Sequence, residues 1–225
     1  MRNYCRPATL ATLLLLLVFA ANTAMAQSRY LKDGQSGVGI GASLGSGDGY
    51  SSLSAAVGYS FGSKFELGVG IAKTSFDDNV IGNDGSATEF DPYFLASIVR
   101  PRNGSMVGLE LSAQYGKATL SSDALDEAVW DMTSTLWSFG GNLYLKVVSS
   151  PSLEVYPMVS ADYLTSTTEI EDSYGNSVDD DNSDVSLGVG LGLLFNKKVT
   201  ITPRLSTYDG ETSYGISVGL ILPGA

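Results

Sequence analysis

Hydrophobic and polar residues alternate with a period of two over most of the chain. Between Val185 and Leu193 every second residue is apolar, and the residues between them are Ser or Gly. Such alternation is typical of β-strands that have one apolar face. We predict ten strands, near residues 36–45, 51–61, 64–74, 89–100, 105–117, 134–147, 152–164, 185–195, 198–206 and 213–222.

The connections between these strands are alternately short and long. Short turns are predicted at 62–63, 101–104, 148–151 and 196–197, and longer connections at 75–88, 118–133 and 165–184. Connections of intermediate length, at 46–50 and 207–212, fall in the same alternating positions as the longer ones. The longer connections collect acidic residues, among them Glu89 and the run from Asp179 to Asp184, whereas Lys and Arg border the short turns. Short turns at the periplasmic end and longer loops outside are typical of an outer-membrane barrel. The predicted fold is therefore all-β, an up-and-down antiparallel transmembrane β-barrel of ten strands, with eight as the alternative count.

Alternation alone does not show which face of the barrel is outside. A soluble lipocalin-like carrier would turn its apolar face inward and its polar face to water. Here the second face is mostly Gly, Ser and Ala, which makes a poor solvent-exposed strand surface. Aromatic residues also gather near strand ends, for example Phe61 and Phe65 beside a short turn and Trp137 towards a long connection. Two aromatic girdles are expected of a lipid-facing barrel, so we predict that the apolar face contacts lipid.

The N-terminus has the three parts of a secretory signal peptide. Arg2 and Arg6 precede an almost wholly apolar stretch, residues 8–21, and Ala24-Met25-Ala26 supplies small residues before a cleavage point. The apolar stretch is shorter than the roughly 20 residues that a membrane-spanning helix needs. We therefore predict that residues 1–26 are a cleaved signal peptide and that residues 27–225 form an outer-membrane β-barrel domain. Cleavage removes Cys5, the one cysteine, so neither a disulfide nor a thiolate metal site is expected.

Composition argues against several functions. The formal charge of −11 falls to −13 when the two signal arginines are removed, and so acidic a chain is a poor candidate for binding nucleic acid. The sequence contains no histidine, the commonest general base in enzymes. A hydrolase that uses two carboxylates, such as Glu110 and Glu154, is the remaining enzymatic alternative. No glycine-rich segment precedes a helix, so the sequence predicts no phosphate-binding loop. We expect neither an enzyme nor a cofactor.

The face opposite the apolar one predicts the contents of the lumen. Glycines dominate several strands on this face, while other strands contribute long polar side chains. A polar network in the lumen is predicted from Glu66, Glu110, Lys146, Glu154 and Arg204. Lys146 and Arg204 are expected to pair with Glu66, Glu110 or Glu154, because an unpaired buried charge costs several kcal/mol. Weak candidates for a metal site lie in one outer connection: Asp179, Asp180, Asp181 and Asp184.

With this pattern of strands and connections, residues 27–225 resemble the small outer-membrane barrels of the OmpA, OmpX and opacity-protein type. The resemblance lies in the pattern and in no specific motif. The chain departs from that class at Leu222-Pro223-Gly224-Ala225, where such proteins usually end in an aromatic residue. The resemblance implies a structural, adhesive, resistance-related or weakly permeable protein. We expect a non-enzymatic structural or surface-interaction role, with a narrow porin-like channel for small solutes as the alternative. The expected partners are outer-membrane lipid and divalent cations at the outer loops.

Overall fold

A computed structural model describes residues 28–77, 85–101, 106–122, 125, 130–172 and 174–224. The predicted signal peptide lies outside these residues. The described elements are a 3-10 turn, η1 (Ser28–Tyr30), and β1 (Gly37–Gly47), β2 (Tyr50–Phe61), β3 (Phe65–Phe76), β4 (Ser86–Val99), β5 (Val107–Ser121), β6 (Trp130–Leu145), β7 (Val148–Ser149), β8 (Leu153–Asp172), β9 (Ser177–Phe195), β10 (Val199–Tyr208) and β11 (Glu211–Pro223). None of the helices in these residues has the length and hydropathy to cross a membrane.

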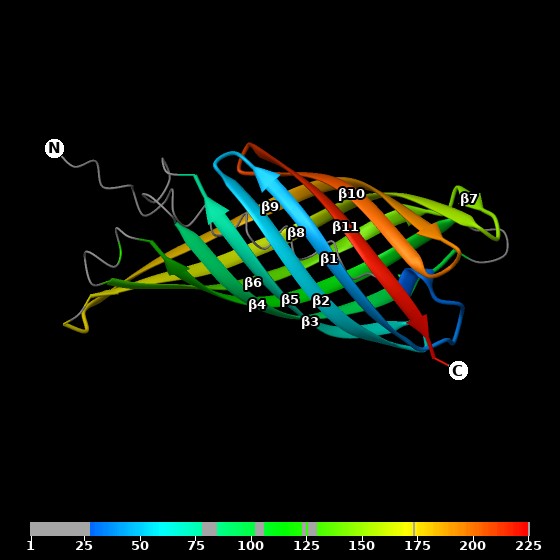
Figure 1. Ribbon diagram of the computed structural model, residues 1–225, viewed down its shortest axis with the longest axis horizontal. Coiled ribbons are helices and arrows are strands. Elements are labelled where there is room, and N and C mark those ends of the chain that lie inside the picture. The colour runs from blue at the N-terminus through cyan, green and yellow to red at the C-terminus, as the bar shows by residue number, and fades with distance from the viewer. Residues whose placement is uncertain are drawn as a thin grey trace.

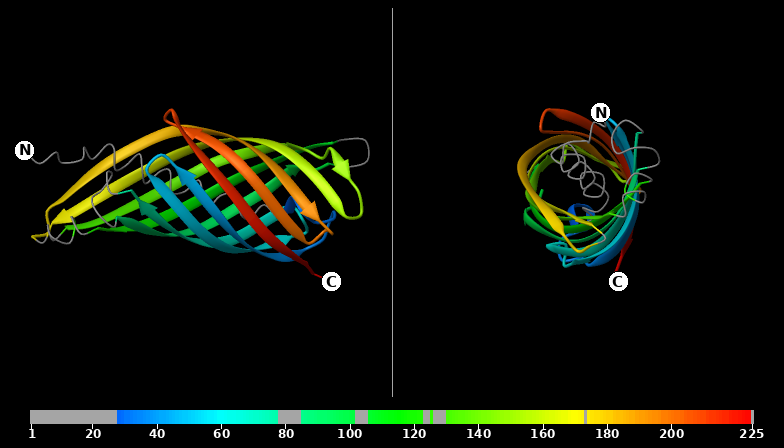
Figure 2. Two further views of the ribbon diagram at one scale, coloured as in Figure 1. Left: turned by 45° about the horizontal axis from the view of Figure 1, so that its top comes forward. Right: turned by 90° about the vertical axis from the view of Figure 1, so that its left-hand side faces the viewer.

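The strands form one closed antiparallel barrel. Each long strand pairs with its neighbours along the chain, β6 pairs with β8, and β1 closes the ring by pairing with β11 from Gly37↔Pro223 to Ser46↔Tyr214. Seen along its length, the barrel is a complete ring (Figure 2). The two-residue β7 only extends the edge of β8 inside a turn, so the barrel wall has ten strands. The predicted count of ten is confirmed, and the alternative of eight is wrong.

Several connections are tight two-residue turns. Gly62 and Ser63 both have positive φ, as do Asn196 with Lys197 and Asp209 with Gly210. Two successive residues of positive φ define the turn whose twist matches the right-handed twist of the strands it joins. Asp-Gly is among the preferred sequences for this turn. The predicted connection 207–212 is therefore shorter than expected, since strand pairing continues to Tyr208↔Glu211.

A belt of apolar side chains covers the outside of the barrel. Leu67, Val189 and Val218 leave 52%, 53% and 48% of their surfaces exposed, while the residues beside them on the strand point inward. Exposed aromatic side chains lie in this belt and contact one another, as Tyr59 does Phe61 with ring centroids 4.7 Å apart. So large an apolar surface matches a hydrocarbon surrounding rather than water. The soluble lipocalin-like alternative is wrong, because its apolar face would point inward.

Two strands extend much further than the sequence predicted. Residues 165–184 were expected to form a loop, but β8 and β9 remain paired from Thr165↔Ser183 out to Glu171↔Ser177. The resulting projecting hairpin reaches the far end of the barrel (Figure 1, yellow), where β6 stays paired with β8 out to Trp130↔Asp172. Pairing between β9 and β10 stops at Thr207↔Leu187, so β10 does not accompany the projecting part of β9.

A second correction concerns β4. Glu89 was assigned to an outer connection, but it lies on β4, faces the lumen and is 2% exposed. The register of β4 against β5 shifts between Ser97 and Val99, and Leu95 and Ala96 are buried one after the other. A bulge of this kind breaks the strict alternation of faces. It explains why the phase of this strand could not be read from the sequence.

Candidate functional site

The lumen is the interior space where polar side chains meet, and a cluster of buried apolar side chains lies towards each of its ends. At the end near the projecting hairpin, an outer apolar cluster consists of Tyr50, Phe76, Ala87, Ala118, Leu120, Met132, Leu136, Leu164 and Tyr208. At the opposite end, an inner apolar cluster consists of Leu31, Tyr144, Tyr156, Met158, Leu194 and Ile221, with Tyr30 packed against it. Close-packed apolar side chains exclude water and ions. An apolar layer therefore lies towards each end of the lumen.

The segment that precedes β1 enters the inner end of the lumen. The turn η1 lies inside the ring of strands (Figure 2, blue), where Ser28 is fully buried and Arg29 is 6% exposed. Arg29 Nη2 lies 2.5 Å from Glu110 Oε2. Burial alone lowers the pKa of Arg29, but the carboxylate of Glu110 more than offsets this and raises the pKa above its ordinary value. Arg29 is therefore a fixed cation in the lumen.

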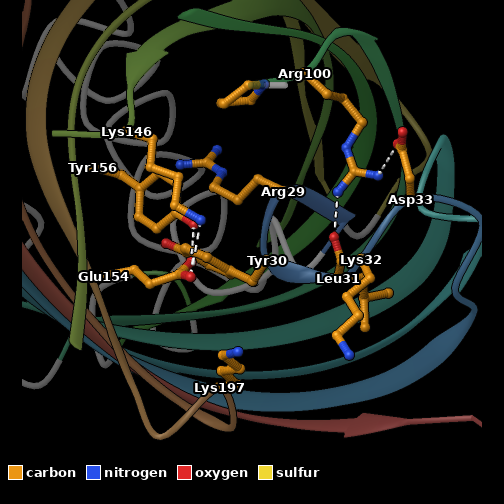
Figure 3. A pocket seen from close by; sticks show the side chains of 11 residues that line it. Arg29, Tyr30, Leu31, Lys32, Asp33, Arg100, Lys146, Glu154, Tyr156 and Lys197 are labelled. Carbon is orange, nitrogen blue, oxygen red and sulfur yellow. Dashed lines mark hydrogen bonds and ion pairs between the residues drawn. The ribbon is translucent and has the colours of Figure 1, made fainter. Parts of the chain in front are cut away.

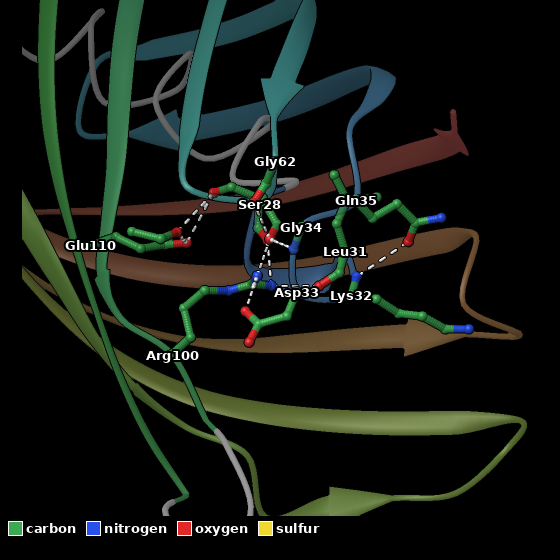
Figure 4. Close-up of polar contacts among 11 residues, drawn as sticks. Ser28, Leu31, Lys32, Asp33, Gly34, Gln35, Gly62, Arg100 and Glu110 are labelled. Atoms are coloured by element: carbon green, nitrogen blue, oxygen red, sulfur yellow. Dashed lines mark hydrogen bonds and ion pairs between the residues drawn. The ribbon is translucent and has the colours of Figure 1, made fainter. Parts of the chain in front are cut away.

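Arg100, which follows β4, holds the same segment from the other side. Its guanidinium donates hydrogen bonds to the carbonyl oxygens of Ser28, at 3.0 Å, and Leu31. It also pairs with Asp33 Oδ1 at 3.1 Å and donates to Ser63 Oγ (Figure 4). One planar guanidinium thus fixes three points of the segment and one point of the β2–β3 turn, a geometry that suits Arg and not Lys.

Glu66 binds the start of the segment without any cation. Its carboxylate accepts hydrogen bonds from the backbone N–H of Ser28 at 2.9 Å, from Ser60 Oγ at 3.0 Å and from the Tyr93 hydroxyl at 3.0 Å. Three donors satisfy a carboxylate that is fully buried. Neither Lys146 nor Arg204 pairs with Glu66 in the described ion pairs.

The remaining predicted lumen residues form two separate ion pairs. Lys146 Nζ lies 2.8 Å from Glu154 Oε1, and the Tyr156 hydroxyl donates to the same carboxylate. Arg204 Nη2 lies 3.3 Å from Asp162 Oδ2 and 2.6 Å from Ser160 Oγ. The structure therefore brings Lys146 to Glu154, but Arg204 meets none of the three expected glutamates. The sequence reasoning missed Asp162 as the partner of Arg204.

A pocket of about 520 Å³ opens at the inner mouth of the barrel. It is lined by Arg29, Tyr30, Leu31, Lys32, Asp33, Arg100, Pro101, Lys146, Glu154, Tyr156 and Lys197. Figure 3 shows Arg29 and Tyr30 in its middle, with Lys146 and Glu154 on one side and Arg100 with Asp33 on the other. The pocket therefore ends on the η1 segment, and cations outnumber anions among its lining residues.

The metal-site candidates lie at the opposite end, on the projecting part of β9. Asp179 and Asp181 are exposed, whereas Asp180 and Asp184 are partly buried. Thr167 Oγ1 donates to Asp181 at 2.7 Å, and Asp184 Oδ1 accepts from the N–H of Val185 at 2.6 Å. Among the residues that the structure describes, no three His, Cys, Asp or Glu side chains are grouped closely enough to hold a metal ion.

Two other functional residues were missed by the sequence reasoning. Arg29 is the third residue after the predicted cleavage point and belongs to no alternating segment, so no pattern placed it in the lumen. Asp91 neighbours Glu89 on β4 and is 1% exposed. The sequence does contain a signal for Asp91. Glu89, Asp91 and Tyr93 occupy alternate positions with Phe90 between the first two, and this alternation extends the strand from Tyr93 back to Glu89.

These features define a closed, lipid-facing β-barrel with charged side chains in its interior. Residues 11–219 match the family model described as the outer membrane protein beta-barrel domain. The chain belongs to this family, and its location is the outer membrane. No curated protein matches the sequence.

Solved structures of bacterial barrels resemble the chain at low identity. Ail, the attachment invasion locus protein of Yersinia pestis, is 13% identical, with 86% of this chain and 100% of Ail covered and a TM-score of 0.43. The N-terminal β-barrel domain of Pseudomonas aeruginosa OprF is 14% identical, with coverage of 83% and 97% and a TM-score of 0.35. The translocator domain of the autotransporter NalP from Neisseria meningitidis is 13% identical, with coverage of 96% and 97% and a TM-score of 0.47. Identities this low carry no information about activity.

Proposed function

We propose that this protein is a closed, non-enzymatic barrel with a structural and surface-interaction role, and that it acts through the projecting β8–β9 hairpin. The observation that carries this proposal is the filling of the lumen. The outer apolar cluster occupies one end, and the η1 segment with the inner apolar cluster occupies the other. A barrel of about eight strands is just filled by its side chains, and ten strands is near that limit.

The chemistry of the lumen supports a non-enzymatic role. Glu110 and Glu154, the two carboxylates considered for a hydrolase, are each engaged by a cation, Arg29 and Lys146 respectively. A general acid needs a proton and a general base needs access to a substrate, and a fully buried, ion-paired Glu110 offers neither. The sequence supplies no histidine as an alternative base.

The outward face of the hairpin gives the surface role its chemistry. Glu169 lies directly opposite Asp179, and Thr167 lies opposite Asp181, so carboxylates are neighbours across the two strands. Like charges directly opposite each other destabilise a strand pair. Divalent cations relieve this repulsion, because Ca²⁺ and Mg²⁺ prefer oxygen ligands. We infer that such ions bridge the hairpin carboxylates to the phosphates of the surrounding outer leaflet.

Thermal unfolding in two surroundings tests this role. The protein is placed in bilayers rich in phosphate headgroups and separately in a neutral, phosphate-free detergent, each with and without Ca²⁺. The variant Asp179→Asn/Asp180→Asn/Asp181→Asn should lose the part of the Ca²⁺ stabilisation that is seen only in the bilayer. An equal response of this variant and of the wild type in the bilayer would contradict a role for the hairpin.

A narrow channel for small solutes is the second candidate, favoured by the pocket at the inner mouth. Its charged lining is open on the periplasmic side, and Lys146 with Glu154 stands at its wall. In the proposed function this pocket is a blind end, because the η1 segment and the inner apolar cluster lie behind it. Replacing both residues, as in Lys146→Ala with Glu154→Ala, should then widen the mouth without creating a stable conductance.

A further inference from the structure

Two acidic side chains of the lumen, beside the outer apolar cluster, have no counter-charge among the described ion pairs. Glu89 and Asp91 lie on β4 and are 2% and 1% exposed. None of the described ion pairs involves either residue. Removing a carboxylate from water without a partner costs several kcal/mol, so a buried pair of them calls for a further positive group.

The oxygen atoms of this pair point into a space that other oxygens share. Glu89 Oε2, both carboxylate oxygens of Asp91 and the carbonyl oxygen Oε1 of Gln114 are buried and have no hydrogen-bond partner among the described residues. Gln114 lies on β5, is 4% exposed and adjoins Asp91. Its amide adds a buried oxygen without a hydrogen-bond partner beside the acidic pair.

Glycines make room for these oxygens. A Cβ added at Gly116 on β5 would lie 2.4 Å from Glu89 Oε1 and 3.0 Å from Asp91 Oδ1, so both carboxylates lie over one glycine. A Cβ at Gly70, which pairs with Asp91 on the other side, would lie 3.6 Å from Asp91 Oδ2. The site is thus a cradle on the wall formed by β3, β4 and β5.

We propose that Glu89, Asp91 and Gln114 bind a hard divalent cation, Ca²⁺ in the first place, inside the lumen above Gly116. Two carboxylates and an amide carbonyl are the ligand types that Ca²⁺ takes from proteins, and water completes its six to eight ligands. The ion neutralises the buried pair and joins β4 to β5 beside the outer apolar cluster. This site is separate from the acidic hairpin and does not depend on its proposed role.

Metal content after refolding tests the proposal. The mature chain is freed of metal with a chelator, refolded into a neutral, phosphate-free detergent with millimolar CaCl₂, and passed through a column in Ca²⁺-free buffer. Atomic emission should find one Ca²⁺ per chain in the wild type and none in Glu89→Gln/Asp91→Asn. The matched control, Asp179→Asn/Asp180→Asn/Asp181→Asn, should retain its Ca²⁺. This control separates the lumen site from the hairpin.

Two milder variants keep the test independent of folding defects. Gln114→Ala preserves both carboxylates and should weaken Ca²⁺ binding about tenfold, or about 1.4 kcal/mol. Gly116→Ala fills the cradle without changing charge and should also lower the amount of Ca²⁺ retained. A wild type that retains no Ca²⁺ would overturn the proposal and leave a shared proton as the counter-charge. Equal retention by Glu89→Gln/Asp91→Asn and by the wild type would overturn it as well.

Discussion

Arg29 Nη2 and Glu110 Oε2 lie 2.5 Å apart inside the barrel, with 4% and 0% of their side chains exposed. This pair ties the segment before β1 to the wall at β5, and no other cation is paired with Glu110 among the described ion pairs. The closure of the inner end therefore depends on a residue that no strand contains.

The first prediction concerns this pair. Glu110→Gln leaves the buried guanidinium of Arg29 without a counter-charge and should lower the free energy of unfolding by about 3–5 kcal/mol. The double variant Arg29→Met/Glu110→Gln removes both charges and should cost less than Glu110→Gln alone. Urea unfolding in lipid vesicles compares the free energy of unfolding of the wild type with that of the two variants. If the single and double variants were equally unstable, the two residues would not be coupled.

A second prediction concerns the guanidinium of Arg100. Arg100→Ala removes the bonds to Ser28, Leu31 and Asp33 and should release the η1 segment from the mouth of the barrel. Limited proteolysis should then cut after Arg29, which is 6% exposed in the folded barrel. Arg100→Lys keeps the charge but cannot reach several carbonyl oxygens at once, and it should be cut at an intermediate rate. Full protection in Arg100→Ala would show that the segment is held elsewhere.

The third prediction concerns the apolar belt. Val189→Arg places a charge in the middle of the lipid-facing surface and should cost about 2–4 kcal/mol of stability in bilayers. The matched control is Ser183→Arg, which lies on the same face of β9 but on the projecting hairpin, where it should be neutral within about 0.5 kcal/mol. Folding into vesicles at a series of urea concentrations compares them. Equal effects of the two substitutions would place Val189 outside the hydrocarbon.

The fourth prediction concerns orientation. A cysteine at Asp180 or Tyr174, on the projecting hairpin, should react with a membrane-impermeant thiol reagent on intact cells. Cysteines at Lys64 and Lys198, beside the tight turns of the other end, should react only after the outer membrane is permeabilised. Tyr174, Lys64 and Lys198 are exposed and Asp180 is partly buried, so accessibility to water alone does not distinguish the two ends. The reverse labelling pattern would invert the barrel in the membrane.

The apolar alternation carried most of the fold. Positions such as Leu67, Val189 and Val218 predicted both the strands and their outward face, because lipid selects apolar residues at every second position of each strand. This alternation does not mark the parts of a strand that extend beyond the membrane, because lipid does not contact them. The outer parts of β8 and β9 are built from Thr, Ser, Asp and Glu, whose pairing rests on backbone hydrogen bonds and leaves no apolar period to read.

The contents of the lumen were less accessible to sequence reasoning. The inward face of Glu66, Glu110 and Arg204 follows from strand phase, but their partners depend on which strands lie across the barrel. Arg29 pairs with Glu110, and Arg204 pairs with Asp162. Glu89 was hidden because the bulge near Ser97 obscured the phase of β4. The inward apolar residues of the outer cluster, such as Leu164, sit in polar stretches where no apolar run marks them.

Single-channel conductance of the refolded mature protein in planar bilayers tests most directly whether the lumen is closed. Both apolar clusters and the η1 segment lie across the path of ions, so the wild type should show no stable conductance. Deleting residues 28–35 should remove only the part of the inner closure that the η1 segment forms, and the outer cluster around Met132 and Leu164 should still prevent a steady open state. A large and stable conductance from the wild-type protein would contradict the closed barrel and identify the protein as a pore.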